Sequence, residues 1–91
     1  MSVENSGGSC SYYVVDVECP QHLDPYTAEC GDIVDALELT PNEANIFKEL
    51  WRTAAARKGK KKQGHTTIRA AEKIQFYANR IHQLTTHRLS K

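Results

Sequence analysis

The stretch that decides the fold is Thr40-Pro41-Asn42-Glu43, followed by ANIFKELWRTAAAR at residues 44–57. Thr is favoured just before a helix, and Pro fits the first helical position, where no amide hydrogen is needed. Glu three residues after Thr can close a capping box by accepting a hydrogen bond from the Thr amide. The pattern predicts a helix from residue 41. Its expected apolar stripe comprises Phe47, Leu50, Trp51, Ala54 and Ala55.

Downstream, the segment RKGKKKQG at residues 57–64 holds two glycines and five cations, so it predicts the end of this helix and a basic loop. A further helix is expected after Thr66 or Thr67, running towards Arg88. Its residues at alternating spacings of three and four predict a packing seam. These residues are Thr67, Ala70, Ile74, Tyr77, Ile81 and Leu84. The two helices should therefore form a helical hairpin.

Upstream, five residues recur at helical spacing and predict another helix with Pro25 near its start. They are Tyr26, Cys30, Ile33, Val34 and Leu37. Its opposite face is acidic, and is either a solvated stripe or a docking surface for the basic half. The stretch YYVVDV at residues 12–17 predicts one extended strand, and without a second comparable run it should pair across a subunit boundary or lie against helices.

The fold class is thus predicted as mainly α, a three-helix domain with a short N-terminal extended segment. Residues 1–11 should be a flexible arm and residues 12–91 a single helical domain. A chain of 91 residues buries a modest share of its surface, so a homo-oligomer is expected. No apolar run approaches the length of a membrane span, which predicts a cytosolic protein without membrane contact.

Charge divides the chain into two halves. All twelve Lys and Arg residues lie at or after Lys48, whereas residues 1–47 carry nine of the eleven carboxylates and no Lys or Arg. Either the halves neutralise each other, in the fold or across an oligomer, or the basic half meets a phosphate-bearing ligand. The acidic surface nearby argues against binding of an extended nucleic acid.

Three cysteines without an export signal argue against a disulfide framework. The Cys19-x-x-His22 pair with Cys30 and Cys10 is a weak match to zinc spacing, and Cys30 is expected to be buried as a small apolar side chain. His65, His82 and His87 show no metal-ligand spacing and should lie on the surface. Neither a metal nor a cofactor is expected.

The basic loop resembles a phosphate loop, since Gly59-x-x-x-x-Gly64 is followed by His65-Thr66, but His replaces the required Lys and helix replaces the preceding strand. A glycine-bearing basic loop before a helix still offers amides and Lys side chains to a phosphate. The alternative is a solvated hairpin tip. Trp51 and Tyr77 either stack a nucleobase or, as their stripes suggest, pack in the core.

Five motifs follow one another in the chain: His22 with Tyr26, Glu29-Cys30-x-Asp32-Ile33-x-x-Ala36-Leu37, Glu43-Ala44-Asn45-x-Phe47-Lys48-x-x-Trp51-Arg52, Arg57-Lys58-Gly59-Lys60-Lys61, and Ala71-x-Lys73-x-x-x-Tyr77-x-x-Arg80. In this order they resemble the SaV-like family of small bacteriophage proteins, often labelled nucleotide kinase. The resemblance covers roughly residues 20–82.

The resemblance implies a phage-encoded helical protein of the host cytoplasm with a nucleotide connection, and it leaves open whether the protein is an enzyme. Two hypotheses follow: binding of a phosphate-bearing nucleotide, to sequester or phosphorylate it, or docking on a host protein in host takeover or anti-defence. The ligand-binding residues implied for the first are Asn45, Lys48, Arg52, Lys60, Lys61, Lys62, Lys73 and Tyr77. No catalytic residue is identified.

Overall fold

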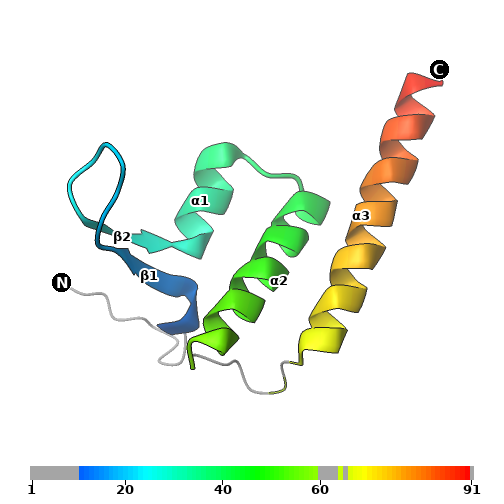
Figure 1. The fold of residues 1–91 in the computed structure, drawn as a ribbon. Coiled ribbons are helices and arrows are strands. Elements are labelled where there is room, and N and C mark those ends of the chain that lie inside the picture. The colour runs from blue at the N-terminus through cyan, green and yellow to red at the C-terminus, as the bar shows by residue number, and fades with distance from the viewer. Residues whose placement is uncertain (1–10, 60–63, 65, 91) are drawn as a thin grey trace.

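The computed structural model describes residues 11–59, 64 and 66–90. In chain order they form the 3-10 turn η1 (Ser11–Tyr13), strands β1 (Val14–Val17) and β2 (Tyr26–Glu29), and helices α1 (Cys30–Leu37), α2 (Pro41–Arg57) and α3 (Thr67–Leu89). The three helices lie side by side with α2 in the middle, and the strands lie beside α1 and α2, away from α3 (Figure 1). The predicted class, mainly α with three helices and a short N-terminal extended segment, is confirmed.

The extended segment is one arm of an antiparallel hairpin rather than a lone strand. Val14 lies opposite Glu29 and Val17 opposite Tyr26, and the Thr27 hydroxyl donates a 2.9 Å hydrogen bond to Asp16 Oδ1. The expectation that this strand lacks a partner within the chain was therefore wrong. The sequence does not predict β2, because its stretch YTAE is short and carries a single β-branched residue.

Helix α1 begins at Cys30, so the predicted start near Pro25 and Tyr26 was also wrong. Tyr26 lies at the apolar spacing of the predicted helical face, but pairing of residues 26–29 with β1 holds this segment extended. Cys30 is only 1% exposed, which confirms its predicted burial. The helix ends at Leu37. The residue that follows, Glu38, is its C-cap and has a left-handed φ of 55°, and the Leu39 amide donates to the Val34 carbonyl at 3.1 Å.

Helices α2 and α3 begin where their capping residues predict. The Thr40 amide donates to Glu43 Oε1 at 2.9 Å and the Glu43 amide donates to Thr40 Oγ1 at 3.4 Å, which completes the capping box. Thr66, rather than Thr67, caps α3 by accepting from the Arg69 amide at 3.2 Å. α2 ends at Arg57, as predicted. Most of the basic loop lies outside the described residues, as do residues 1–10 of the predicted arm at residues 1–11, whose last residue, Ser11, begins η1.

The helices form a layer one helix thick, so few side chains are enclosed. Among the described residues, the buried hydrophobic ones are Cys30 and Ala70, and the buried charged one is Glu49 at 6% exposure. The seam of α3 faces α2 through Ala70 and partly buried residues that follow it. Leu50 was expected in the apolar stripe of α2 but is 55% exposed, because none of the described elements covers that side of the helix.

Candidate ligand-binding site

A buried carboxylate joins the two long helices. Glu49 Oε2 lies 2.7 Å from Arg52 Nη1 on α2 and 3.7 Å from Lys73 Nζ on α3. Arg52 also donates from Nε to the Tyr13 hydroxyl at 2.5 Å, and its guanidinium lies 5.5 Å from the centre of the Tyr13 ring. This network ties η1, α2 and α3 together, and it places a negative charge between two of the cations expected to bind phosphate.

The structure therefore brings together only some of the predicted ligand-binding residues. Arg52 and Lys73 meet at Glu49, and Asn45 and Lys48 lie partly buried on α2. Lys60, Lys61 and Lys62 lie outside the described residues. Because Glu49 offsets part of the charge of Arg52 and Lys73, these two side chains contribute less attraction for a phosphate than two unpaired cations would.

Tyr77, the remaining predicted residue, shares a shallow depression of about 260 Å³ with Lys73 on the surface of α3. Its ring meets the ring of Phe76 edge-on, with the centroids 5.3 Å apart. Arg69 and Glu72 complete the lining, so all contributing residues come from one helix. A depression on a single helix face encloses little of a ligand, which makes it a poor candidate for a small-molecule site.

Sequence reasoning missed Glu49 as a structural residue. Glu49 stood out only as one of two carboxylates in the basic half of the chain. Its spacing of three residues from Arg52 is the available signal, because side chains three apart on a helix are neighbours. Its burial depends on α3, which no local pattern identifies.

Burial controls the ionisation of two residues near this network. It raises the pKa of the Cys30 thiol, with the nearby positive charges of Lys48 and Arg52 opposing the shift. It also raises the pKa of Tyr13, against the hydrogen bond and charge of Arg52. Both groups therefore stay protonated at neutral pH, and neither has the activated form that a nucleophile requires.

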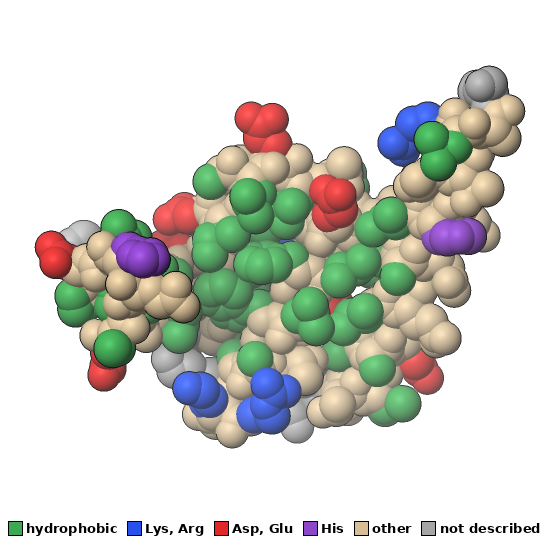
Figure 2. Space-filling view, turned by 45° about the horizontal axis from the view of Figure 1, so that its top comes forward, with side chains coloured by type: hydrophobic (Ala, Val, Ile, Leu, Met, Phe, Trp, Pro, Cys, Tyr) green, Lys and Arg blue, Asp and Glu red, His purple; other side chains and the backbone are tan. Residues whose placement is uncertain are grey.

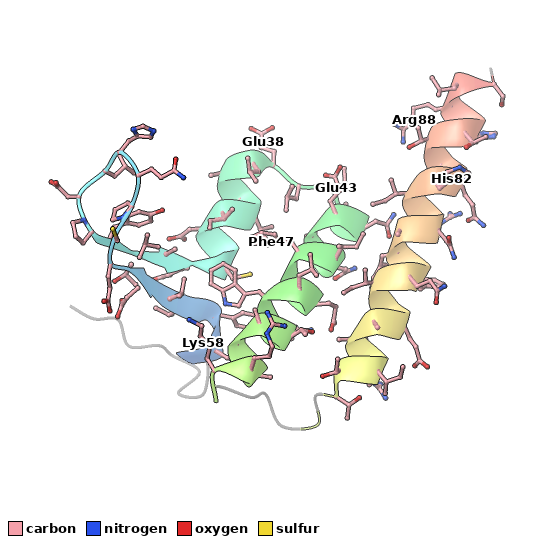
Figure 3. The ribbon with its side chains drawn as sticks, viewed as in Figure 1. Glu38, Glu43, Phe47, Lys58, His82 and Arg88 are labelled. Atoms are coloured by element: carbon pink, nitrogen blue, oxygen red, sulfur yellow. The ribbon has the colours of Figure 1, made fainter. Side chains whose placement is uncertain are left out.

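A concave apolar surface lies on the other side of α2, where η1 and β1 meet it. The hollow has a volume of about 250 Å³ and is lined by Tyr12, Val14, Val15, Trp51, Ala54, Ala55 and Lys58. Trp51 is held in place because its Nε1 donates a 2.6 Å hydrogen bond to the Tyr12 carbonyl oxygen. Lys58 supplies the charge in this lining, and its side chain extends from the end of α2 beside β1 (Figure 3).

The position of Trp51 is compatible with both predicted alternatives, packing in the core and stacking on a ligand. Its ring packs 5.8 Å from that of Phe47 and its indole nitrogen is satisfied by Tyr12, as expected for a core residue with a polar edge. The same side chain also forms a wall of the hollow. Trp51 therefore packs against the fold and remains open to a ligand on one side.

Comparison of the chain with protein-family models, with curated proteins and with solved structures gives no significant match. None of the helices in the described part of the chain has the length and apolar character that a membrane crossing needs. Within residues 11–59, 64 and 66–90, His, Cys, Asp and Glu side chains form no group of three or more that suits a metal ion.

Proposed function

We propose that this protein binds a phosphate-bearing nucleotide, with a flat base in the hollow between β1 and α2 and an anionic group beside Lys58. The observation that carries the proposal is the combination of Tyr12 and Trp51 with a Lys side chain in one concave apolar surface. Aromatic side chains beside a cation are the usual means of holding a base and its phosphate, and stacking of one base is worth about 1–3 kcal/mol.

The size of the hollow suits this ligand class. A volume of about 250 Å³ accommodates one planar ring system but not a whole nucleotide, so the sugar and phosphate would extend past Lys58. Lys60, Lys61 and Lys62 follow Lys58 closely in the sequence and remain in the prediction as further phosphate contacts. The proposed ligand is therefore the predicted one, but its base lies in the hollow between β1 and α2 rather than beside Arg52 and Lys73.

The proposal is for binding rather than phosphoryl transfer. A kinase needs carboxylates that hold Mg²⁺ and a group that accepts the proton of the attacking hydroxyl. In the described residues Glu49 is the buried carboxylate, and it already accepts from Arg52. The phage origin and host cytoplasm implied by the resemblance remain predictions, and sequestering a nucleotide would be the corresponding role.

Native mass spectrometry with a pool of nucleoside mono-, di- and triphosphates and cyclic dinucleotides tests the proposal directly. We expect a discrete nucleotide adduct, which Ala55→Leu should abolish by filling the hollow and Lys58→Gln should weaken. Ala78→Leu is the matched control, because it places the same side chain at an exposed position of α3. Wild-type protein without any adduct, or an adduct that Ala55→Leu leaves unchanged, would refute the site.

A second candidate function is docking on a host protein. The observation that favours it is Leu23, which is 68% exposed on the connection between β1 and β2, where that connection projects away from the helices (Figure 1). Burial of an exposed Leu side chain against a partner contributes about 1.5–3 kcal/mol. Affinity capture from host lysate should then yield a stoichiometric protein that Leu23→Ser loses and Leu89→Ser, the exposed control on α3, retains.

A further inference from the structure

One stripe of helix α2 is exposed at its two ends and at its centre, and its charge changes from end to end. The stripe consists of Glu43, Leu50 and Arg57. Each residue follows the previous one by seven positions, or about two helical turns, so all three lie on the same side of the helix. All three are exposed, Leu50 by 55%. Along the helix, the stripe is negative at Glu43, apolar at Leu50 in its centre, and positive at Arg57.

None of the described elements buries this stripe. On one side α2 packs against α3 through Glu49, and on another it packs against η1 through Trp51. Figure 2 shows apolar side chains gathered over the helices, with acidic side chains above the middle of this surface and basic side chains below it, and with further charges of both signs towards the sides of the view. Glu43 and Lys58 lie at these opposite ends of α2 (Figure 3).

We propose that this face binds a second copy of the chain, with the two α2 helices antiparallel around a two-fold axis at Leu50. The axis places Leu50 against Leu50 of the second copy. Because Glu43 and Arg57 are equally far from Leu50, the same rotation places each Glu43 opposite Arg57 of the second copy. The stripe is thus complementary to itself, as a two-fold interface requires.

The charges of the described residues favour a second copy of the chain as the partner on this face. Among the described residues, the salt bridges are those of Glu49 with Arg52 and Lys73, and both lie within the basic half. Within residues 11–59, 64 and 66–90, no carboxylate of the acidic half forms a salt bridge with a cation of the basic half. An antiparallel second copy pairs Glu43 of the acidic half with Arg57 of the basic half twice.

Burial supports the same occupant. Cys30 and Ala70 are the enclosed hydrophobic residues of the described chain, which is a thin core for a domain of this size. Covering the apolar side of a single helical layer with a second layer is the usual way to complete such a core. Leu50, at the centre of the stripe, would change from largely exposed to buried.

The first test is the oligomeric state of the full chain, measured by sedimentation velocity and native mass spectrometry over a range of concentrations. We expect a dimer that weakens with added salt, because part of its attraction is between exposed charges. Leu50→Asp should weaken it by at least about ten-fold, equivalent to about 1.4 kcal/mol. Leu89→Asp is the matched control, since Leu89 is 81% exposed at the far end of α3.

A charge exchange tests the antiparallel arrangement itself. Arg57→Glu opposes two carboxylates across the axis and Glu43→Lys opposes two cations, so each variant alone should dimerise poorly. A mixture of the two variants restores both attractive pairs, and native mass spectrometry should show the mixed dimer in preference to either self-dimer. Circular dichroism of each variant checks that its helices are intact, since Glu43 also belongs to the capping box.

Three results would overturn the proposal. The first is a wild-type protein that stays monomeric at about 100 µM, a concentration that detects dimers weaker than most specific complexes. The second is a folded Leu50→Asp variant that dimerises like the wild type. The third is a mixture of folded charge variants without a mixed dimer, which would exclude the antiparallel arrangement.

Discussion

Lys73 of α3 lies 3.7 Å from the carboxylate of Glu49 on α2, and this contact is the ionic link between the two long helices in the described structure. The Glu49 side chain is 7% exposed and the Lys73 side chain 43%, so the pair lies at the edge of the interface. Arg52 holds the same oxygen at 2.7 Å from within α2. Glu49 thus has a structural role within a segment that the sequence associates with ligand binding.

Replacing Glu49 with Gln should destabilise the fold. The substitution keeps the shape but leaves Arg52, whose side chain is 16% exposed, without its counter-charge. We expect a loss of about 1–3 kcal/mol in the free energy of unfolding, measured by urea denaturation. Glu72→Gln, an exposed neighbour on α3, should change it by less than about 0.5 kcal/mol. Equal effects of the two substitutions would contradict the role assigned to Glu49.

Trp51→Phe should loosen the N-terminal part of the domain. The change retains an aromatic ring but removes the indole donor to the Tyr12 carbonyl, which should cost about 1 kcal/mol of stability. Hydrogen exchange should accelerate at the amides of η1 and β1 and stay unchanged in α3. Uniform acceleration over the whole chain would instead indicate a general loss of packing.

Glu38→Gly should stabilise the protein. Glu38 has a φ of 55° at the end of α1, a left-handed conformation that Gly adopts without the steric cost paid by other residues. We expect a gain of about 0.5–1 kcal/mol in thermal or urea unfolding. Asp35→Gly, within α1, should have the opposite sign because glycine weakens a helix interior. A loss of stability in Glu38→Gly would show that the carboxylate contributes more than the backbone strain costs.

Stability should fall in alkaline solution. Burial raises the pKa of Cys30 above its ordinary 9.0, so the unfolded chain releases this proton at a lower pH than the folded protein does. Below about pH 9 both states are protonated and the effect vanishes; above it the unfolded state is favoured. Urea denaturation between pH 8 and about pH 10.5 should show the decline, and Cys30→Ala should flatten it. The same slope in this variant would assign the decline to other groups, such as Tyr13.

The boundaries of α2 and the start of α3 were predictable because their causes are local, whereas the start of α1 was not. Thr40, Pro41 and Glu43 specify the start of α2 through contacts within one turn, and Thr66 does the same for α3. The strand at residues 26–29 was not predictable in this way. Its extended conformation depends on β1, whose nearest paired residue, Val17, lies nine positions away from Tyr26 along the chain.

The residues that line the candidate site were not predictable from the sequence. The sequence indicates that Trp51 either stacks on a ligand or packs in the core. For Tyr12, Val14 and Val15, which also line the hollow, it predicts only a strand. Their meeting across a hollow depends on how the hairpin crosses α2. Likewise, the predicted cations Arg52 and Lys73 do converge, but on Glu49.

By itself the sequence determined the helical class, the ends of α2 and α3, and the division of charge, because caps and composition act over a few residues. The tertiary structure alone decided that Glu49 is buried and that Leu50, the next residue, is 55% exposed. Adjacent residues on a helix point about 100° apart, so their environments depend on where the neighbouring helices lie. That placement is a property of packing, which no local pattern encodes.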